Sequence, residues 1–185
     1  MQADLITVPA CVNCNGGASE DDEDLRFYLS VQVGKPTDGA TQLWDRGAHK
    51  TLIRKTKLRV PFLDNMREVT TTDQTGKPVK RLGFEAPLDL YQRVFERIVR
   101  GLYFHHTERI LPPDTPVLVD PIEDPNLLGL KSTFLKKGQI GERAFVYHYA
   151  VETDDALNSF WFFEFHDRHY VLVNTGRLCA DDACR

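Results

Sequence analysis

Alternating aromatic residues in the last third of the chain constrain its fold more than any other sequence feature. In the stretch RAFVYHYAVE, four side chains share one side of an extended segment, because successive residues of a strand point to opposite faces. They are Phe145, Tyr147, Tyr149 and Val151. The following stretch SFWFFEFHDRHYVLV predicts two more strands joined by a turn at residues 166–168. Together these segments predict an antiparallel sheet of several strands.

The helices are predicted from apolar periodicity and from their caps. The clearest helix lies in FEAPLDLYQRVFERIVRGLYFHH, where apolar residues recur at spacings of three and four and Pro87 suits the first turn. A helix over residues 19–33 is expected because Ser19 is a good N-cap and the acids after it suit the positive end of a helix. One further helix is expected within residues 40–59, and the Thr-rich stretch 67–80 predicts an exposed hairpin.

This order of elements predicts an α+β fold, in which an antiparallel sheet carries helices on one face. We expect two parts, a knuckle-like N-terminal segment with the first helix at 1–33 and the α+β domain at 34–185. The chain of 185 residues is long enough for one sizeable core. It has no apolar run near the length of a membrane span and its start does not resemble a secretory signal, so a cytoplasmic protein is expected.

Two groups of cations are candidates for binding nucleic acid, one in residues 50–59 and one on the predicted helix near residue 97. The formal charge of −4 opposes a protein that coats nucleic acid, although a local basic face remains compatible with it. A solvated surface is the simpler interpretation of both groups. The candidates are Lys50, Arg54, Lys55, Arg93, Arg97 and Arg100.

Cys11 and Cys14 form a C-x-x-C pair near the start of the chain. In a reducing compartment a close pair of this kind indicates metal or redox chemistry more often than a disulfide scaffold. His105 and His106 are adjacent at the end of the predicted helix, where one is expected to face the core and the other to point outward. They are candidates for a metal or phosphate contact, or for plain stabilisation of the helix end.

The segment VPACVNCNGGASEDDEDLR resembles the second half of the zinc-ribbon type of HNH endonuclease, in which C-x-x-C-N is followed by glycine and an acidic helix start. Downstream, RIVRGLYFHHTERILPPDTPV resembles the stretch that follows the nuclease module in the same group of bacterial proteins. The resemblance covers most of the chain. It implies a structural zinc ion as the cofactor.

In that family an upstream C-x-x-C pair completes the zinc site, and a histidine after it acts as general base. Nothing of this kind precedes Cys11 in this sequence. The resemblance therefore suggests that Cys179 and Cys184 replace the missing pair and join Cys11 and Cys14 in a four-thiolate site. Three alternatives remain: a metal-free knuckle, ligands from a second copy of the chain in a homodimer, and a disulfide.

Because no histidine stands ahead of the knuckle, no catalytic residue is assigned. The resemblance implies a non-catalytic binding protein derived from a nuclease, which acts on a protein partner as an inhibitor or adaptor. Relatives of this kind are common in phages and mobile elements, where such a role would serve anti-defence. The alternatives are a divalent-metal-dependent DNA endonuclease and a DNA-binding module.

Overall fold

A five-stranded antiparallel sheet, in the order β3-β7-β6-β5-β4, forms one layer of the protein. The computed structural model describes residues 6–8, 18–31, 36–72, 76–122, 135–141, 144–154 and 157–176. The sheet comprises β3 (Val117–Ile122), β4 (Lys136–Ile140), β5 (Phe145–Val151), β6 (Ser159–Phe165) and β7 (His169–Thr175). β6 and β7 form a hairpin that closes at residues 166–168, as the sequence predicts.

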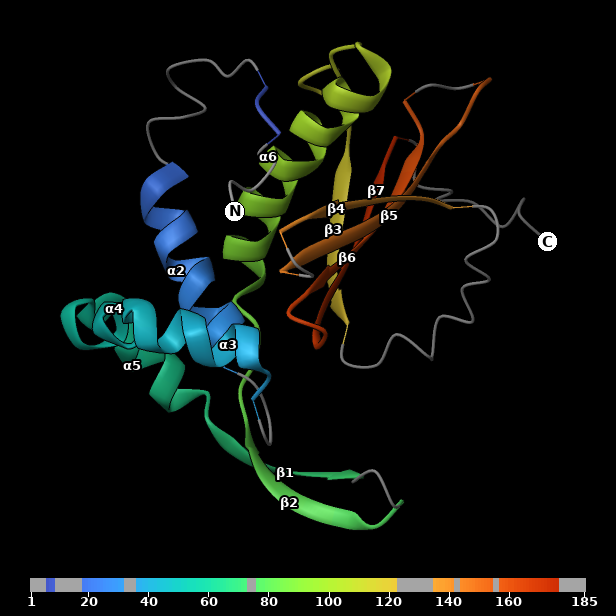
Figure 1. The fold of residues 1–185 in the computed structure, drawn as a ribbon. Coiled ribbons are helices and arrows are strands. Elements are labelled where there is room, and N and C mark those ends of the chain that lie inside the picture. The colour runs from blue at the N-terminus through green and yellow to red at the C-terminus, as the bar shows by residue number, and fades with distance from the viewer. Residues whose placement is uncertain are drawn as a thin grey trace.

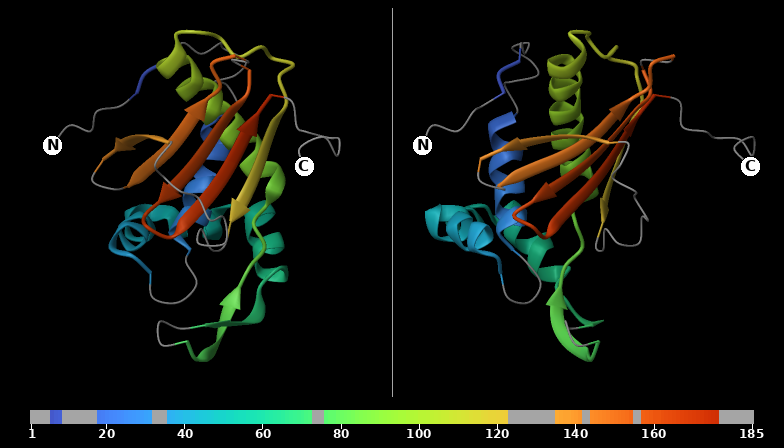
Figure 2. Two further views of the ribbon diagram at one scale, coloured as in Figure 1. Left: turned by 90° about the vertical axis from the view of Figure 1, so that its right-hand side faces the viewer. Right: turned by 45° about the vertical axis from the view of Figure 1, so that its right-hand side comes forward.

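Helix α6 (Leu88–Thr107) lies against one face of the sheet, and α2 (Ala18–Ser30) lies beside α6 (Figures 1 and 2). The apolar stripe of α6 meets the inward side chains of β6 and β7, where alternate residues are buried. Phe95 of α6 packs on Phe163 of β6 with 5.5 Å between ring centroids. Trp161, Phe163 and Val173 are fully buried in this core. The predicted α+β fold with helices on one face of an antiparallel sheet is therefore confirmed.

A second group of elements follows α2 (Figure 1). Its first helix approaches the β6–β7 turn, where a Cβ atom on Gly39 would overlap His166, and the hairpin at its end projects away from the five-stranded sheet. The group contains α3 (Asp38–Leu43), the π-helical turn η1 (Trp44–Ala48), α4 (His49–Arg54) and α5 (Thr56–Asp64). After α5 the chain forms the projecting hairpin of β1 (Arg67–Thr72) and β2 (Pro78–Gly83). This hairpin confirms the prediction for residues 67–80.

An aromatic cluster holds this second group to the rest of the protein. Phe62 of α5 packs edge-on against Phe27 of α2, with ring centroids 5.0 Å apart. Phe84, directly after β2, packs against both Phe62 and Tyr28. The base of the hairpin is therefore fixed by the same core that holds α2.

The helix expected within residues 40–59 is broken twice. Gly47 has a φ of 114°, which L-residues with side chains rarely adopt, and Lys55 is extended between α4 and α5. Trp44 in η1 is 39% exposed. Within the described part of the chain, no helix combines the length and the apolar character that crossing a membrane requires.

Candidate functional site

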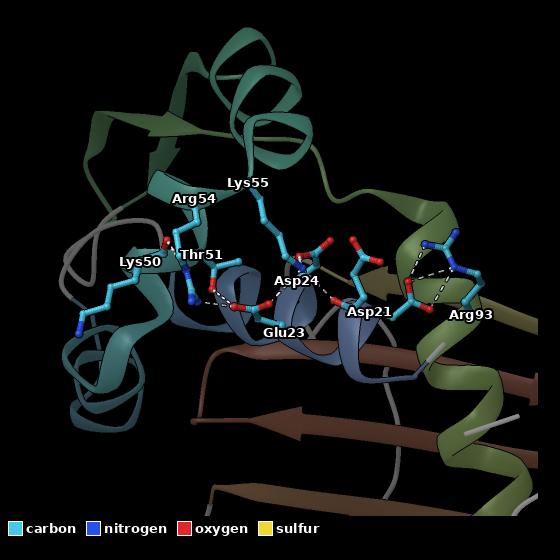
Figure 3. Close-up of polar contacts among 9 residues, drawn as sticks. Asp21, Glu23, Asp24, Lys50, Thr51, Arg54, Lys55 and Arg93 are labelled. Atoms are coloured by element: carbon cyan, nitrogen blue, oxygen red, sulfur yellow. Dashed lines mark hydrogen bonds and ion pairs between the residues drawn. The ribbon is translucent and has the colours of Figure 1, made fainter. Parts of the chain in front are cut away.

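The acids of α2 bind cations from helices on both of its sides, which Figure 3 shows. On the α6 side, Asp21 accepts hydrogen bonds from Arg93 at 2.9 to 3.3 Å and from Arg97 at 3.0 Å. Arg97 also donates to Asp22 at 3.0 Å. These contacts join residues more than seventy positions apart in the sequence.

On the opposite side, α2 binds the junction of α4 and α5. Glu23 accepts from Arg54 at 2.7 Å and from the Thr51 hydroxyl at 3.0 Å. Lys55 lies 2.6 Å from Asp24 and 3.2 Å from Glu23. We call Asp21–Asp24 and the cations bound to them the ion-pair belt. It ties α2, α6 and the α4–α5 junction together.

The ion pairs shift the ionisation of their members. The hydrogen bond from Arg93 is the main reason that the pKa of Asp21 lies below its ordinary value, against the opposing effect of burial. Hydrogen bonds from Lys55 and Thr51 likewise lower the pKa of Glu23. Burial by itself would lower the pKa of Lys55, but the bonds to Asp24 and Glu23 outweigh it and raise the pKa. These shifts favour the charged forms of Asp21, Glu23 and Lys55.

Most of the cations that were proposed to contact nucleic acid form ion pairs or hydrogen bonds with other groups of the chain. Four of them, Arg54, Lys55, Arg93 and Arg97, belong to the ion-pair belt. Arg100 pairs with Glu96 at 2.8 Å and donates to the carbonyl oxygens of the loop after α6. Lys50 points away from the belt carboxylates in Figure 3. The structure thus does not gather these six side chains on one open basic face.

The ring of His106 contacts two tyrosines of β5, whereas His105 is exposed. The two ring nitrogens of His106 lie 2.9 Å from the Tyr147 hydroxyl and 3.0 Å from the Tyr149 hydroxyl. A neutral imidazole satisfies both bonds, since it donates from one nitrogen and accepts at the other. Burial, followed by the charges of His105 and Lys136, lowers the pKa of His106. Both nitrogens are therefore occupied by protein groups.

A small open pocket of about 160 Å³ lies beside His106, between the end of α6 and the β4–β5 edge of the sheet. Its lining includes Thr107, Lys136 and Tyr149. The Lys136 ammonium lies 5.9 Å from the centre of the Tyr149 ring, in a cation–π arrangement. This pocket brings the Lys136 ammonium next to the side chains of His106, Thr107 and Tyr149.

A second histidine that is hydrogen-bonded to a tyrosine, the half-buried His169, was not among the predicted site residues. His169 of β7 is hydrogen-bonded to the hydroxyl of Tyr91, which is fully buried in α6. Burial, with a smaller contribution from His166, lowers the pKa of His169 to about 4. Burial also raises the pKa of Tyr91, so its hydroxyl stays protonated.

The zinc ligands predicted from the resemblance, Cys11, Cys14, Cys179 and Cys184, lie outside the described residues. Among the residues that the structure does describe, no group of three or more His, Cys, Asp or Glu side chains is placed to hold a metal ion.

Exposed apolar side chains on the second group of elements are the feature that sequence reasoning missed. On α5, Val60 and Leu63 are 48% and 51% exposed, while Leu58 and Phe62 on the other side of the same helix are buried. Ile53 of α4 and Leu82 of β2 are also exposed. The i, i+3 spacing of Val60 and Leu63 was the available signal, because it places both on one helix face.

Comparison of the chain with protein-family models, with curated proteins and with solved structures finds no match. The resemblance to HNH endonucleases therefore stays a prediction. Within the described residues, the geometry supplies paired cations, exposed apolar side chains and two histidines that are hydrogen-bonded to tyrosines.

Proposed function

We propose that this chain is a non-catalytic binding protein that acts through protein interaction, as an inhibitor or adaptor. The observation that carries the proposal is that five of the six cations expected to contact nucleic acid are bound by the chain's own carboxylates and carbonyls. Cations already paired in this way release fewer counterions on meeting a phosphate backbone, so they contribute less to binding nucleic acid.

The exposed apolar residues support the same proposal. Soluble proteins carry single exposed apolar side chains everywhere, but a concentration of them on one part of the surface is typical of contact with another protein. Val60 and Leu63 lie on α5, Ile53 on α4 and Leu82 on β2, all within the second group of elements. A role in phage or mobile-element anti-defence follows from the resemblance alone and belongs to this proposal.

A structural zinc ion at Cys11, Cys14, Cys179 and Cys184 is a separate proposal. Four thiolates are a donor set that suits zinc in a closed tetrahedral site, where the metal would add folding energy. Purified full-length protein is expected to carry one zinc per chain, and Cys11→Ser is expected to lose it. Stoichiometric zinc that survives this substitution would exclude the site.

The binding function is tested by tagging the full chain and recovering its complexes from lysate of host or phage-infected cells. One stoichiometric protein partner, measured by native mass spectrometry, is the expected result. In parallel, plasmid is incubated with the protein and Mg²⁺ or Mn²⁺, and a DNA duplex is tested by gel shift at rising salt. Cleavage that disappears in the double variant His105→Ala, His106→Ala would replace the proposal with an endonuclease. A steeply salt-dependent shift without a protein partner would favour the DNA-binding module.

A further inference from the structure

Charge is segregated along the chain. Residues 44–85 contain ten Lys and Arg but only five Asp and Glu, so this segment carries a formal charge of +5. Arg54 and Lys55 are paired with Glu23 and Asp24 of α2, which leaves an excess of three positive charges on the segment. The whole chain carries −4, and the remaining residues therefore carry −9. The basic segment corresponds to η1, α4, α5 and the β1–β2 hairpin, which lie together at one end of the protein (Figures 1 and 2).

Exposed apolar side chains concentrate on the same segment. Among the described residues, five of the nine large hydrophobic side chains that are exposed belong to it. Val60 and Leu63 share one face of α5, and Lys57, three residues before Val60, lies next to them and is exposed. We call Lys57, Val60 and Leu63 the α5 face. It combines apolar side chains with a cation.

The α5 face is held in place from behind. Leu58 and Phe62 on the opposite side of α5 are buried, and Phe62 packs against Phe27 and Phe84. A partner that meets the α5 face therefore meets a surface whose backbone is already fixed. Such preorganisation reduces the ordering cost of binding.

We propose that the α5 face docks an acidic segment of another protein that presents apolar side chains. This inference rests on the proposed binding function and names the chemistry of the partner. Charge complementarity favours an acidic partner over a basic one. A second copy of this chain is disfavoured, because a two-fold interface through the α5 face would bring two basic segments together.

The apolar side chains of the α5 face favour a protein partner over nucleic acid. Burying aliphatic surface contributes about 25 cal/mol per Å², but only where the partner offers apolar surface of its own. A phosphate backbone offers none to Val60 and Leu63. An acidic helix with leucines at spacings of three and four would satisfy both the apolar residues and the cations around them.

The test uses a synthetic peptide with Leu at every third and fourth position and Glu elsewhere, titrated into the full chain by fluorescence anisotropy. Saturable binding that weakens with added salt is expected. The double variant Val60→Asp, Leu63→Asp should weaken it about tenfold or more. Ile110→Asp is the matched control, because Ile110 is 79% exposed but lies outside the basic segment. Circular dichroism confirms that each variant is folded.

Four results would overturn the inference. They are no binding of the acidic peptide, equal binding by the double variant, equal binding of a peptide with Lys in place of Glu, and a DNA duplex that binds the same residues as tightly. A dimer in sedimentation that the double variant abolishes would assign the face to a second copy instead. If the double variant still recovers the stoichiometric partner from lysate, the binding function stands and only the surface is wrong.

Discussion

At the scale of single residues, burial favours the neutral form of His106 and His169, the two histidines that are hydrogen-bonded to tyrosines. The Tyr91 hydroxyl is hydrogen-bonded to Nε2 of His169, and burial disfavours the charged form of both side chains. His169 is therefore a packing residue between α6 and the sheet, and its burial favours the neutral imidazole.

The first prediction concerns the pH dependence of folding. The unfolded chain protonates His169 near its ordinary pKa of 6.5, whereas the folded chain does so only at about 4. Between these values the unfolded state holds more protons, so acidification favours unfolding. The free energy of unfolding should be highest above pH 6.5 and should fall by up to about 3 kcal/mol as the pH approaches 4.

Urea unfolding of wild type and His169→Gln at several pH values measures this effect. The variant should show a flatter profile than the wild type between pH 6.5 and 4. Parallel profiles for wild type and His169→Gln would contradict the prediction.

A second residue-scale prediction follows from the close approach of α3 to the β6–β7 turn. A Cβ atom added at Gly39 would overlap the imidazole of His166. Since the turn and the helix are both packed, Gly39→Ala should destabilise the protein by about 1 to 3 kcal/mol. Gln42→Ala, at an exposed position of the same helix, is the control and should change little in thermal denaturation. An unchanged melting temperature for Gly39→Ala would show that His166 moves aside freely.

At the scale of elements, the acids of α2 do more than favour the start of a helix. Asp21 and Asp22 are adjacent, but their side chains are 17% and 60% exposed, and only Asp21 receives bonds from two arginines. Within the ion-pair belt, Asp21 and Asp22 bind α6 on one side of α2, and Glu23 and Asp24 bind the α4–α5 junction on the other side.

The belt predicts unequal effects for the two neighbouring acids. Asp21→Asn should lower the free energy of unfolding by about 1.5 to 3 kcal/mol at neutral pH, because it leaves Arg93 and Arg97 without their shared carboxylate. Asp22→Asn should cost less than about 1 kcal/mol, as exposed pairs usually do. Denaturant unfolding at low and high salt measures both. Equal losses of unfolding free energy in the two variants would mean that the lower exposure of Asp21 does not strengthen its ion pairs.

At the scale of the whole molecule, the sequence predicted the elements that carry a regular period. The alternation in β5, β6 and β7 and the apolar stripe of α6 were sufficient for the α+β architecture. The breaks at Gly47 and Lys55 were missed because the apolar and basic pattern continues through them. A glycine inside a helical pattern is a weak signal for a kink.

The site was less predictable because its contacts join distant segments. No local pattern indicates that Asp21 binds Arg93, or that Tyr91 binds His169 across 78 positions. The cations of α6 were identified as a basic face, but their partners on α2 decide that this face is neutralised. The α5 face was overlooked because single apolar residues between cations resemble an ordinary solvated surface.

The arrangement of the core predicts that the molecule has two parts of unequal stability. The five-stranded sheet is anchored by α6 over a wide aromatic core, whereas the β1–β2 hairpin touches the core mainly through Phe84 at its base. An isolated two-stranded hairpin is marginally stable in water, so it depends on that attachment. Phe62 packs against Phe27 and Tyr28 of α2 and against Phe84, so it joins α5 to both α2 and the base of the hairpin.

Phe62→Ala should therefore loosen α5 and the hairpin before it affects the sheet. The lost side chain is buried, and a cavity of this size costs about 3 to 5 kcal/mol. In hydrogen exchange, amides of β1, β2 and α5 should lose protection while those of β6 and β7 keep most of theirs, since local opening follows contiguous cooperative units. Leu63→Ala, one position along α5 but half exposed, should leave both parts protected. If all amides of Phe62→Ala lost protection equally, the protein would open as one unit. The α5 face would then unfold only together with the whole fold.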